Sequence, residues 1–394
     1  MTNLIDNLKL QVQTAKPDIF VLTTSTLGAY KLGGAAEADN YEPNTEWLDI
    51  LGDTTSVSIE RGSKRGDSID TEVEVGTLEA HIFDGNVDPN TNPYIKMGVP
   101  MRLQALVDAE WVTQYTGTIS RVTVSYDAEK KSHVTLYAVD RVKDLANINR
   151  AGVVAGTFAE RVEDLLTKHG IDFTVEGGTS SLADNNYEST LVNHLMLAQN
   201  TELGSVFVDK SNVVKAYGNG SLPTSEPVIN FYDAEVDDDP LAAYYLIDGF
   251  GVAYDDSIMV NDIFVRNLTR GVDEDLNYTS VETVYGPFAN NTSVATWGAR
   301  QTELTTNFAT EGDVEDYAAV VLDEFDAPEL RVDTIRWNAT FSVDQVAGLE
   351  LFDMVNIQYS SEAVTINKPF RVMAIKHDIT PDAWLVTLDL LDVN

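Results

Sequence analysis

Short stretches in which polar and apolar residues alternate recur along this chain, and they constrain its fold more than any other feature. They include residues 56–60, 71–75, 101–106 and 121–126. Successive side chains of a β-strand point to opposite faces of the sheet, so a period of two is typical of half-buried strands. Turn-forming clusters separate the stretches, at residues 61–67, 84–93 and 127–132. The alternation predicts a β-barrel or β-sandwich over residues 1–148.

A helical pattern replaces the alternation after residue 148. Thr157 stands three residues before Glu160, the spacing of a reciprocal N-terminal capping box. Apolar residues then follow at helical spacing, and Lys168, His169 and Gly170 supply a basic last turn and a stop, with His169 as a helix-end cation. A second helix is expected around residues 192–199 and a hairpin over 206–217. Residues 149–220 are therefore predicted to form a small α/β module, followed by a linker at 218–227.

Alternating strands return in residues 221–394, and one helix interrupts them. The helix is predicted over residues 313–326 from apolar residues spaced for one helical face: Val314, Tyr317, Ala318, Val321, Leu322 and Phe325. Acidic residues lie in its first turn and Pro328 lies beyond its end. This part of the chain is expected to be a second β-domain.

The end of the first β-region resembles the end of the chain. Residues 98–106, 115–127 and 134–140 match residues 351–359, 368–378 and 386–392 in order. Each set holds a strand, an Arg-Val strand (Arg121, Arg371) and a closing Val-Thr-Leu strand (Val134, Val386). The match predicts two similar β-barrels separated by the α/β insert. The hypothesis fails if the two regions differ in topology or close together into one shared sheet.

Composition excludes several classes of protein. The 394 residues are 43% hydrophobic, enough for packed cores in two or three domains. The chain contains no cysteine, which excludes disulfides and thiolate chemistry, and its five histidines are dispersed, which argues against a zinc site. No apolar run is long enough to span a bilayer, and the N-terminal residues do not have the pattern of a signal peptide.

The formal charge of −37, from 63 acidic and 26 basic residues, disfavours binding to a phosphate backbone. The segment 216–367 contains no lysine. Two interpretations stay open: a solubilising surface, as in a protein adapted to high salt, or a wall along which DNA slides without sticking. On the second interpretation, the candidate lumen-facing residues are Asp233, Glu235, Asp237, Asp238 and Asp239.

Several of these segments, taken in order, resemble the minor tail proteins of siphophages. The segments are residues 57–62, the Gly-Thr strand 74–84, the Pro93-Tyr94 loop, residues 97–103 and 115–119, and the closing hairpin 370–390 with its Ile-Thr-Pro turn and Trp384. Together they cover about half of the chain and preserve the order and spacing of that family. Members of the family are similar to the baseplate hub of contractile tails.

The resemblance implies a mainly β fold with two tail-tube-like barrels, an α/β insert and one further helix. It implies a structural virion protein of the tail tip, made in the host cytoplasm, that forms a ring, expected to be a trimer. The ring would continue the tail tube, adapt six-fold to three-fold symmetry and line the DNA channel. The implied partners are the distal tail protein, the tail tube, the tape-measure protein and other tail-tip proteins, with passing DNA contact. No cofactor is implied.

Motifs of catalysis are missing from the sequence. There is no Gly-x-Ser-x-Gly, His-Glu-x-x-His or phosphate-binding Gly-x-x-x-x-Gly-Lys pattern. The acidic runs 237–239 and 255–256 are expected to be solvated loops, with a structural Ca²⁺ or Mg²⁺ as the alternative. A tail-associated glycan-degrading enzyme and a carbohydrate-binding host-adsorption protein remain as alternative functions. No pair of carboxylates stands out for hydrolysis.

Overall fold

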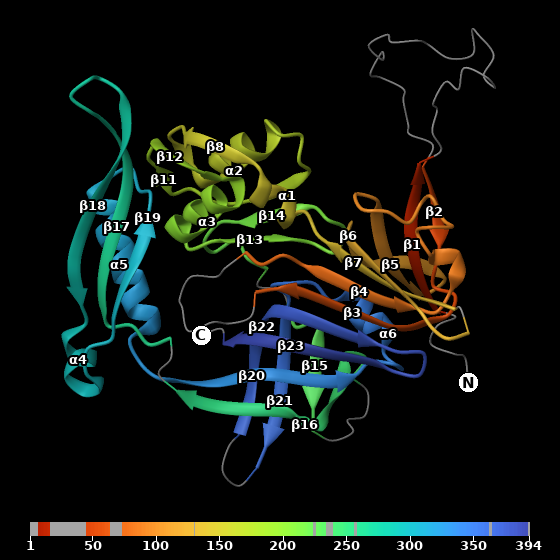
Figure 1. The fold of residues 1–394 in the computed structure, drawn as a ribbon. Helices are drawn as coiled ribbons and strands as arrows, with labels where there is room; N and C mark the ends of the chain where they lie inside the picture. The colour runs from red at the N-terminus through yellow and green to blue at the C-terminus, as the bar shows by residue number, and fades with distance from the viewer. Residues whose placement is uncertain are drawn as a thin grey trace.

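The computed structural model describes residues 7–15, 45–63, 73–129, 131–223, 226–233, 239–255, 258–361 and 365–392. Strands make up 51% of the structure, which confirms the predicted mainly β class. Four parts can be followed in Figure 1: an N-terminal sheet, a helix-containing region above it, a closed barrel below, and a small sheet with a long hairpin at the opposite side.

The N-terminal sheet has seven strands, and all its neighbouring strands are antiparallel. Its alternating apolar residues, with Leu10, Ile59, Leu78 and Leu103 fully buried, belong to one core that continues into the C-terminal barrel. In spatial order the strands are β2 (Thr45–Asp49), β1 (Leu8–Ala15), β5 (Pro100–Val107), β6 (Glu110–Tyr126), β7 (Ser132–Val139), β4 (Thr77–Ile82) and β3 (Thr54–Gly62).

The C-terminal region contains a closed barrel of six strands. Closure occurs because β22 pairs with strands on both of its sides, β21 and β23. Trp337, Trp384, Phe231 and Phe370 are fully buried within it. In order around the ring the strands are β22 (Thr365–Ile379), β21 (Met354–Ser360), β15 (Ile229–Tyr232), β16 (Ala242–Asp255), β20 (Glu329–Asn338) and β23 (Trp384–Asp392); α6 (Val343–Gly348) precedes β21.

The two β-regions share a topology and are also joined. Five strands of the first, β5-β6-β7-β4-β3, have the same neighbour order and antiparallel directions as β21-β22-β23-β20-β16 of the second. They differ at the next strand, because β1 is antiparallel to β5 whereas β15 is parallel to β21. The regions are not separate sheets: β3 pairs with β22, making one sheet of thirteen strands. Among the described strands a ring closes in the C-terminal region, whereas the N-terminal region, predicted as a second barrel, forms part of the shared sheet and keeps only the strand order in common.

Both helices predicted in the helix-containing region form, but the first ends at Thr167, so Lys168 and His169 lie beyond its last turn and the predicted basic last turn is wrong. The side chain of Thr157 accepts the Glu160 N–H, and that of Glu160 accepts the Thr157 N–H at 2.8 Å, which completes the capping box of α2. The region packs its own apolar cluster around Phe158, Leu165 and Leu195. Its elements are α1 (Val142–Asn147), β8 (Asn149–Val153), β9 (Gly156–Thr157), α2 (Phe158–Thr167), β10 (Phe173–Glu176), β11 (Ser181–Leu182), β12 (Asn185–Thr190), α3 (Leu191–Glu202), β13 (Ser205–Val208) and β14 (Val214–Tyr217).

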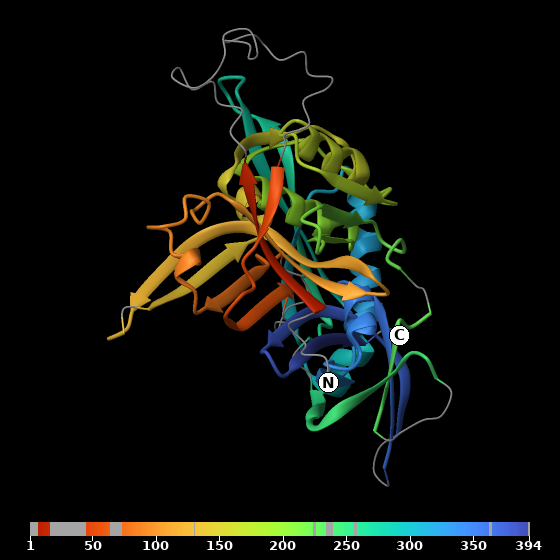
Figure 2. The same ribbon diagram turned by 90° about the vertical axis from the view of Figure 1, so that its right-hand side faces the viewer.

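A separate three-stranded sheet lies between β16 and β20 in the sequence. Its order is β18 (Tyr278–Ala289), β17 (Asp262–Val272) and β19 (Gln301–Thr306), with α4 (Asn291–Trp297) between β18 and β19. The predicted helix at 313–326 is α5 (Glu311–Phe325), whose apolar face covers this sheet. Residues 221–394 thus hold both the barrel and this sheet, and the domain boundaries at 148 and 220 stay predictions. Figure 2 shows the same parts from the side.

Candidate functional site

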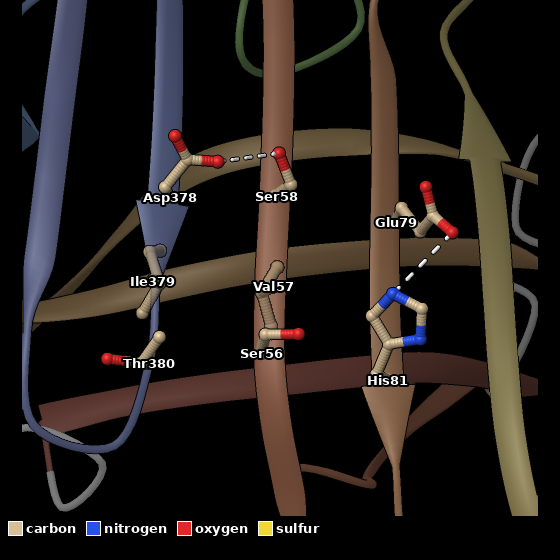
Figure 3. A pocket seen from close by; sticks show the side chains of 8 residues that line it. All are labelled: Ser56, Val57, Ser58, Glu79, His81, Asp378, Ile379 and Thr380. Atoms are coloured by element: carbon tan, nitrogen blue, oxygen red, sulfur yellow. Dashed lines mark hydrogen bonds and ion pairs between the residues drawn. The ribbon is translucent and has the colours of Figure 1, made fainter.

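A shallow groove of about 220 Å³ crosses the sheet where β22, β3 and β4 run side by side. It marks the junction between the N-terminal sheet and the barrel. The Ser58 hydroxyl donates to Asp378 Oδ1 across the β3–β22 pair at 3.1 Å, and His81 Nε2 lies 3.6 Å from Glu79 Oε1 (Figure 3). The lining residues are Ser56, Val57, Ser58, Glu79, His81, Asp378, Ile379 and Thr380.

The groove holds the residue types of a hydrolase triad without the geometry of one. The Ser58 hydroxyl bonds to a carboxylate, whereas His81 contacts Glu79 and the Thr135 hydroxyl, 3.0 Å from its Nδ1. A serine nucleophile needs a base within hydrogen-bond reach of its hydroxyl. Glu79 and His81 are also well exposed, at 41% and 50%. The arrangement therefore binds the strands to each other and activates no nucleophile.

A buried ionic cluster behind this junction connects three parts of the fold. Arg61 at the end of β3 donates both of its terminal nitrogens to the Glu350 carboxylate. The same carboxylate accepts the backbone N–H of Lys210, in the β13–β14 turn, at 3.0 Å. Lys210 Nζ in turn donates to Ala347 O at 2.6 Å. The N-terminal sheet, the α/β region and the barrel are therefore connected through Glu350.

Burial perturbs the ionisation of this cluster. Desolvation lowers the pKa of Arg61 to about 10, which leaves it charged at neutral pH. Desolvation also raises the pKa of Asp140 to about 7, although its carboxylate accepts the N–H groups of Gly76 and Val142. The pKa of Asp353 rises to about 6 for the same reason, opposed by the charge of Lys210. Asp140 lines a cavity of about 20 Å³, and the hydrogen bonds of the cluster run between the parts of the fold, which suits a role in holding those parts together.

The five acidic residues predicted to face a lumen fall between β15 and β16. Asp233 is exposed and Asp239 is partly buried, while Glu235, Asp237 and Asp238 lie outside the described residues. Asp239 is a turn residue, because its side chain accepts the Tyr232 hydroxyl at 2.7 Å and the Leu241 N–H at 2.9 Å. These hydrogen bonds lower the pKa of Asp239 and keep it ionised. Whether the five face a channel stays a prediction.

The described ranges contain neither a metal-binding cluster nor a membrane-spanning helix. They hold no group of three or more His, Cys, Asp or Glu side chains placed to share a metal ion. Within the same ranges, every helix is too short or too polar to cross a bilayer.

The pairing of β3 with β22 is the feature of this candidate site that the sequence did not predict. Each strand was expected to pair within its own region. The polar alternation of residues 56–60 and 376–378 was visible, but alternation specifies which face a side chain takes and not which strand is its neighbour.

No family model and no curated protein matches the sequence. Solved structures do match. A tail protein from Neisseria meningitidis MC58 superimposes with a TM-score of 0.59 at 12% identity, over 98% of this chain and 97% of that one. The 43 kDa tail protein of prophage MuSo2 from Shewanella oneidensis gives 0.55 at 10% identity, over 88% and 95%. Prophage tail protein gp18 from Listeria monocytogenes EGD-e gives 0.50 at 13%, over 88% and 91%. The chain has the fold of these tail proteins across most of its length.

Proposed function

We propose that this chain is a structural, non-enzymatic subunit of a virus tail tip, of the baseplate hub type. Three copies form a ring that continues the tail tube and adapts its six-fold symmetry to three. The observation that carries the proposal is the five-strand order that occurs twice in one chain. Two related β-units per chain give six around a three-fold axis. The fold likeness to prophage tail proteins over 88–98% of the chain supports it.

The β3–β22 pair suits this role physically. It joins the two β-units edge to edge, so that one unit continues the sheet of the next within a single polypeptide. In a ring of three, the remaining unit-to-unit contacts must form between copies. The ionic cluster around Arg61 and Glu350 fixes the angle between the two units, because buried charge pairs tolerate little displacement.

The strong negative charge is consistent with a channel through which DNA passes. A negatively charged wall repels the negatively charged phosphates and releases no counterions from the DNA. Contact therefore gains no binding free energy, and DNA stays mobile along the wall. The proposed lumen residues include Asp233, Glu235, Asp237, Asp238 and Asp239. The proposed partners are the tail tube, the distal tail protein and the tape-measure protein, in the virion tail tip.

Native mass spectrometry and negative-stain microscopy of the purified chain test the proposal. The expected result is a trimer, seen end-on as a ring with six peripheral lobes and a central hole. A chain that stays monomeric at micromolar concentration in both low and high salt would contradict it. So would retention of duplex DNA in a mobility-shift assay at low ionic strength, because the proposed wall repels phosphate.

A further inference from the structure

The distal half of the β17–β18 hairpin, residues 268–284, projects from the molecule and is here called the arm (Figure 1, upper left). Large apolar side chains on it are exposed rather than packed: Val272, Leu276, Tyr278, Val281 and Val284. Leu276 at the tip is 83% exposed and has a φ of +63°, an unfavourable backbone conformation for leucine. Such apolar exposure on a protruding element is typical of an interaction surface.

The arm is held in a fixed shape before any partner binds. The Arg270 guanidinium stacks on the Tyr278 ring at 3.2 Å and also pairs with Asp184 of the neighbouring region at 3.0 Å. Arg266 bridges Glu282 on β18 and Glu303 on β19, at 2.6 and 2.8 Å. A pre-ordered element loses little conformational entropy on binding, which favours its use in recognition.

The charge of the arm limits what it can bind. Its tip carries Asp273, Glu274 and Asp275 in sequence. Asp273 accepts the N–H groups of Asp275 and Asn277, and the hydrogen bond from Asn277 lowers its pKa, so the charge persists. Three adjacent anions beside Leu276 disfavour insertion into an anionic lipid surface. They favour a partner that offers an apolar or aromatic surface together with cations.

This chain presents such a surface at its other side, here called the Trp patch and defined by Lys9, Trp47, Arg102 and Trp111. The Lys9 ammonium lies 3.9 Å from the Trp111 ring centroid, and the Arg102 guanidinium 4.0 Å from that of Trp47. Lys9 and Arg102 belong to the adjacent strands β1 and β5, and both indoles are half-buried. The carboxylate of Asp49, on the same face, accepts a hydrogen bond from the Leu51 N–H at 3.0 Å.

The arm and the Trp patch lie on opposite sides of the molecule, since β17–β18 and β1–β2 stand at the two extremes of Figure 1. The two surfaces of one molecule therefore cannot meet. Two different complementary surfaces on opposite sides produce a head-to-tail contact, which closes into a ring when the rotation between copies permits. A self-matching contact would instead give a two-fold dimer.

We propose that the arm of each copy docks on the Trp patch of the next, with Leu276 against the indoles and Glu274 and Asp275 facing Lys9 and Arg102. This inference rests on the proposed function, because it supplies the contact between copies of the ring.

Charge exchange tests the contact by sedimentation velocity. The double variant Glu274→Lys/Asp275→Lys should weaken self-association by about tenfold or more, because it opposes like charges. Adding Lys9→Glu to the same chain should restore much of the loss. The matched control is Glu315→Lys/Asp316→Lys on exposed positions of α5, which changes the net charge equally away from both surfaces. An equal effect of the control, or no effect of the arm variant, would overturn the proposal.

Cross-linking provides a second test, made simple because the chain has no cysteine. Asp275→Cys chains are mixed with Gln13→Cys chains, Gln13 being the β1 partner of Trp47, and a short bis-maleimide is added. Cross-links should form between the two variants in the mixture and not with Lys143→Cys, an exposed site on α1. Cross-links only between two Asp275→Cys chains, or arm-dependent binding to anionic vesicles, would overturn the proposal. If the unaltered chain associates but shows neither the charge-exchange effect nor the cross-link, the docking proposal is wrong and the proposed ring is unaffected. If the unaltered chain never associates, the proposed ring is wrong, and the docking proposal that depends on it is wrong as well.

Discussion

Replacement of Arg61 by alanine should destabilise the protein by about 3 kcal/mol, because it leaves the Glu350 charge without its cationic partner. Arg61 is 5% exposed and Glu350 21%, so water compensates little. Loss of one partner of a buried pair costs about 3–5 kcal/mol. The lower end is expected because Glu350 still accepts the N–H groups of Lys210 and Leu351.

Urea unfolding followed by circular dichroism and tryptophan fluorescence measures this loss. The matched control is Arg266→Ala, which removes an exposed arginine with two carboxylate partners and should leave the unfolding curve close to that of the unaltered chain. The double variant Arg61→Met/Glu350→Gln should recover part of the loss, because it removes both buried charges. If Arg61→Ala and Arg266→Ala unfold at the same urea concentration, the role given to the cluster is wrong.

Three further predictions follow from the junction and from the charge. Gly62→Ala should cost about 1–3 kcal/mol in urea unfolding, since φ is +84° and a Cβ would collide with the Met373 carbonyl oxygen, whereas Gly85→Ala has open space and should be neutral. Burial lowers the pKa of His377 to about 3, and the neutral ring accepts the Trp384 N–H. In the unfolded chain this histidine takes up a proton below its unfolded pKa of 6.5. Its full contribution to the free energy of unfolding is therefore present above pH 6.5 and is lost as the pH falls. Lowering the pH from 7 to 5 should therefore remove about 2 kcal/mol from the unaltered chain relative to His377→Gln, and parallel pH profiles of the two would refute this. Finally, the melting temperature should rise with NaCl concentration, because salt screens the repulsion within a chain of charge −37; a flat dependence would contradict the reasoning.

Features encoded by neighbouring residues could be predicted from the sequence. The capping box of Thr157 and Glu160 and the apolar face of α5 depend on spacings of three and four residues, and both form where expected. The alternating segments 56–60, 101–106 and 121–126 became strands for the same reason, whereas residues 73–75 are not in a strand and residues 71–72 lie outside the described residues. The β3–β22 pair and the separate sheet of β17, β18 and β19 could not be predicted, because strand partners are chosen by packing between distant segments. The ionic cluster was missed on the same ground, since Arg61 and Glu350 are 289 residues apart.

The pairing of β3 with β22 also affects how the chain is made. Residues 57–62 emerge from the ribosome long before their hydrogen-bonding partner at 374–379 is translated. Until β22 has been translated, β3 is an open sheet edge that is available to other nascent chains. Synthesis halted before residue 365 should therefore yield aggregates rather than a soluble N-terminal fragment. Faithful production of this protein depends on how quickly β22 follows β3 into the sheet.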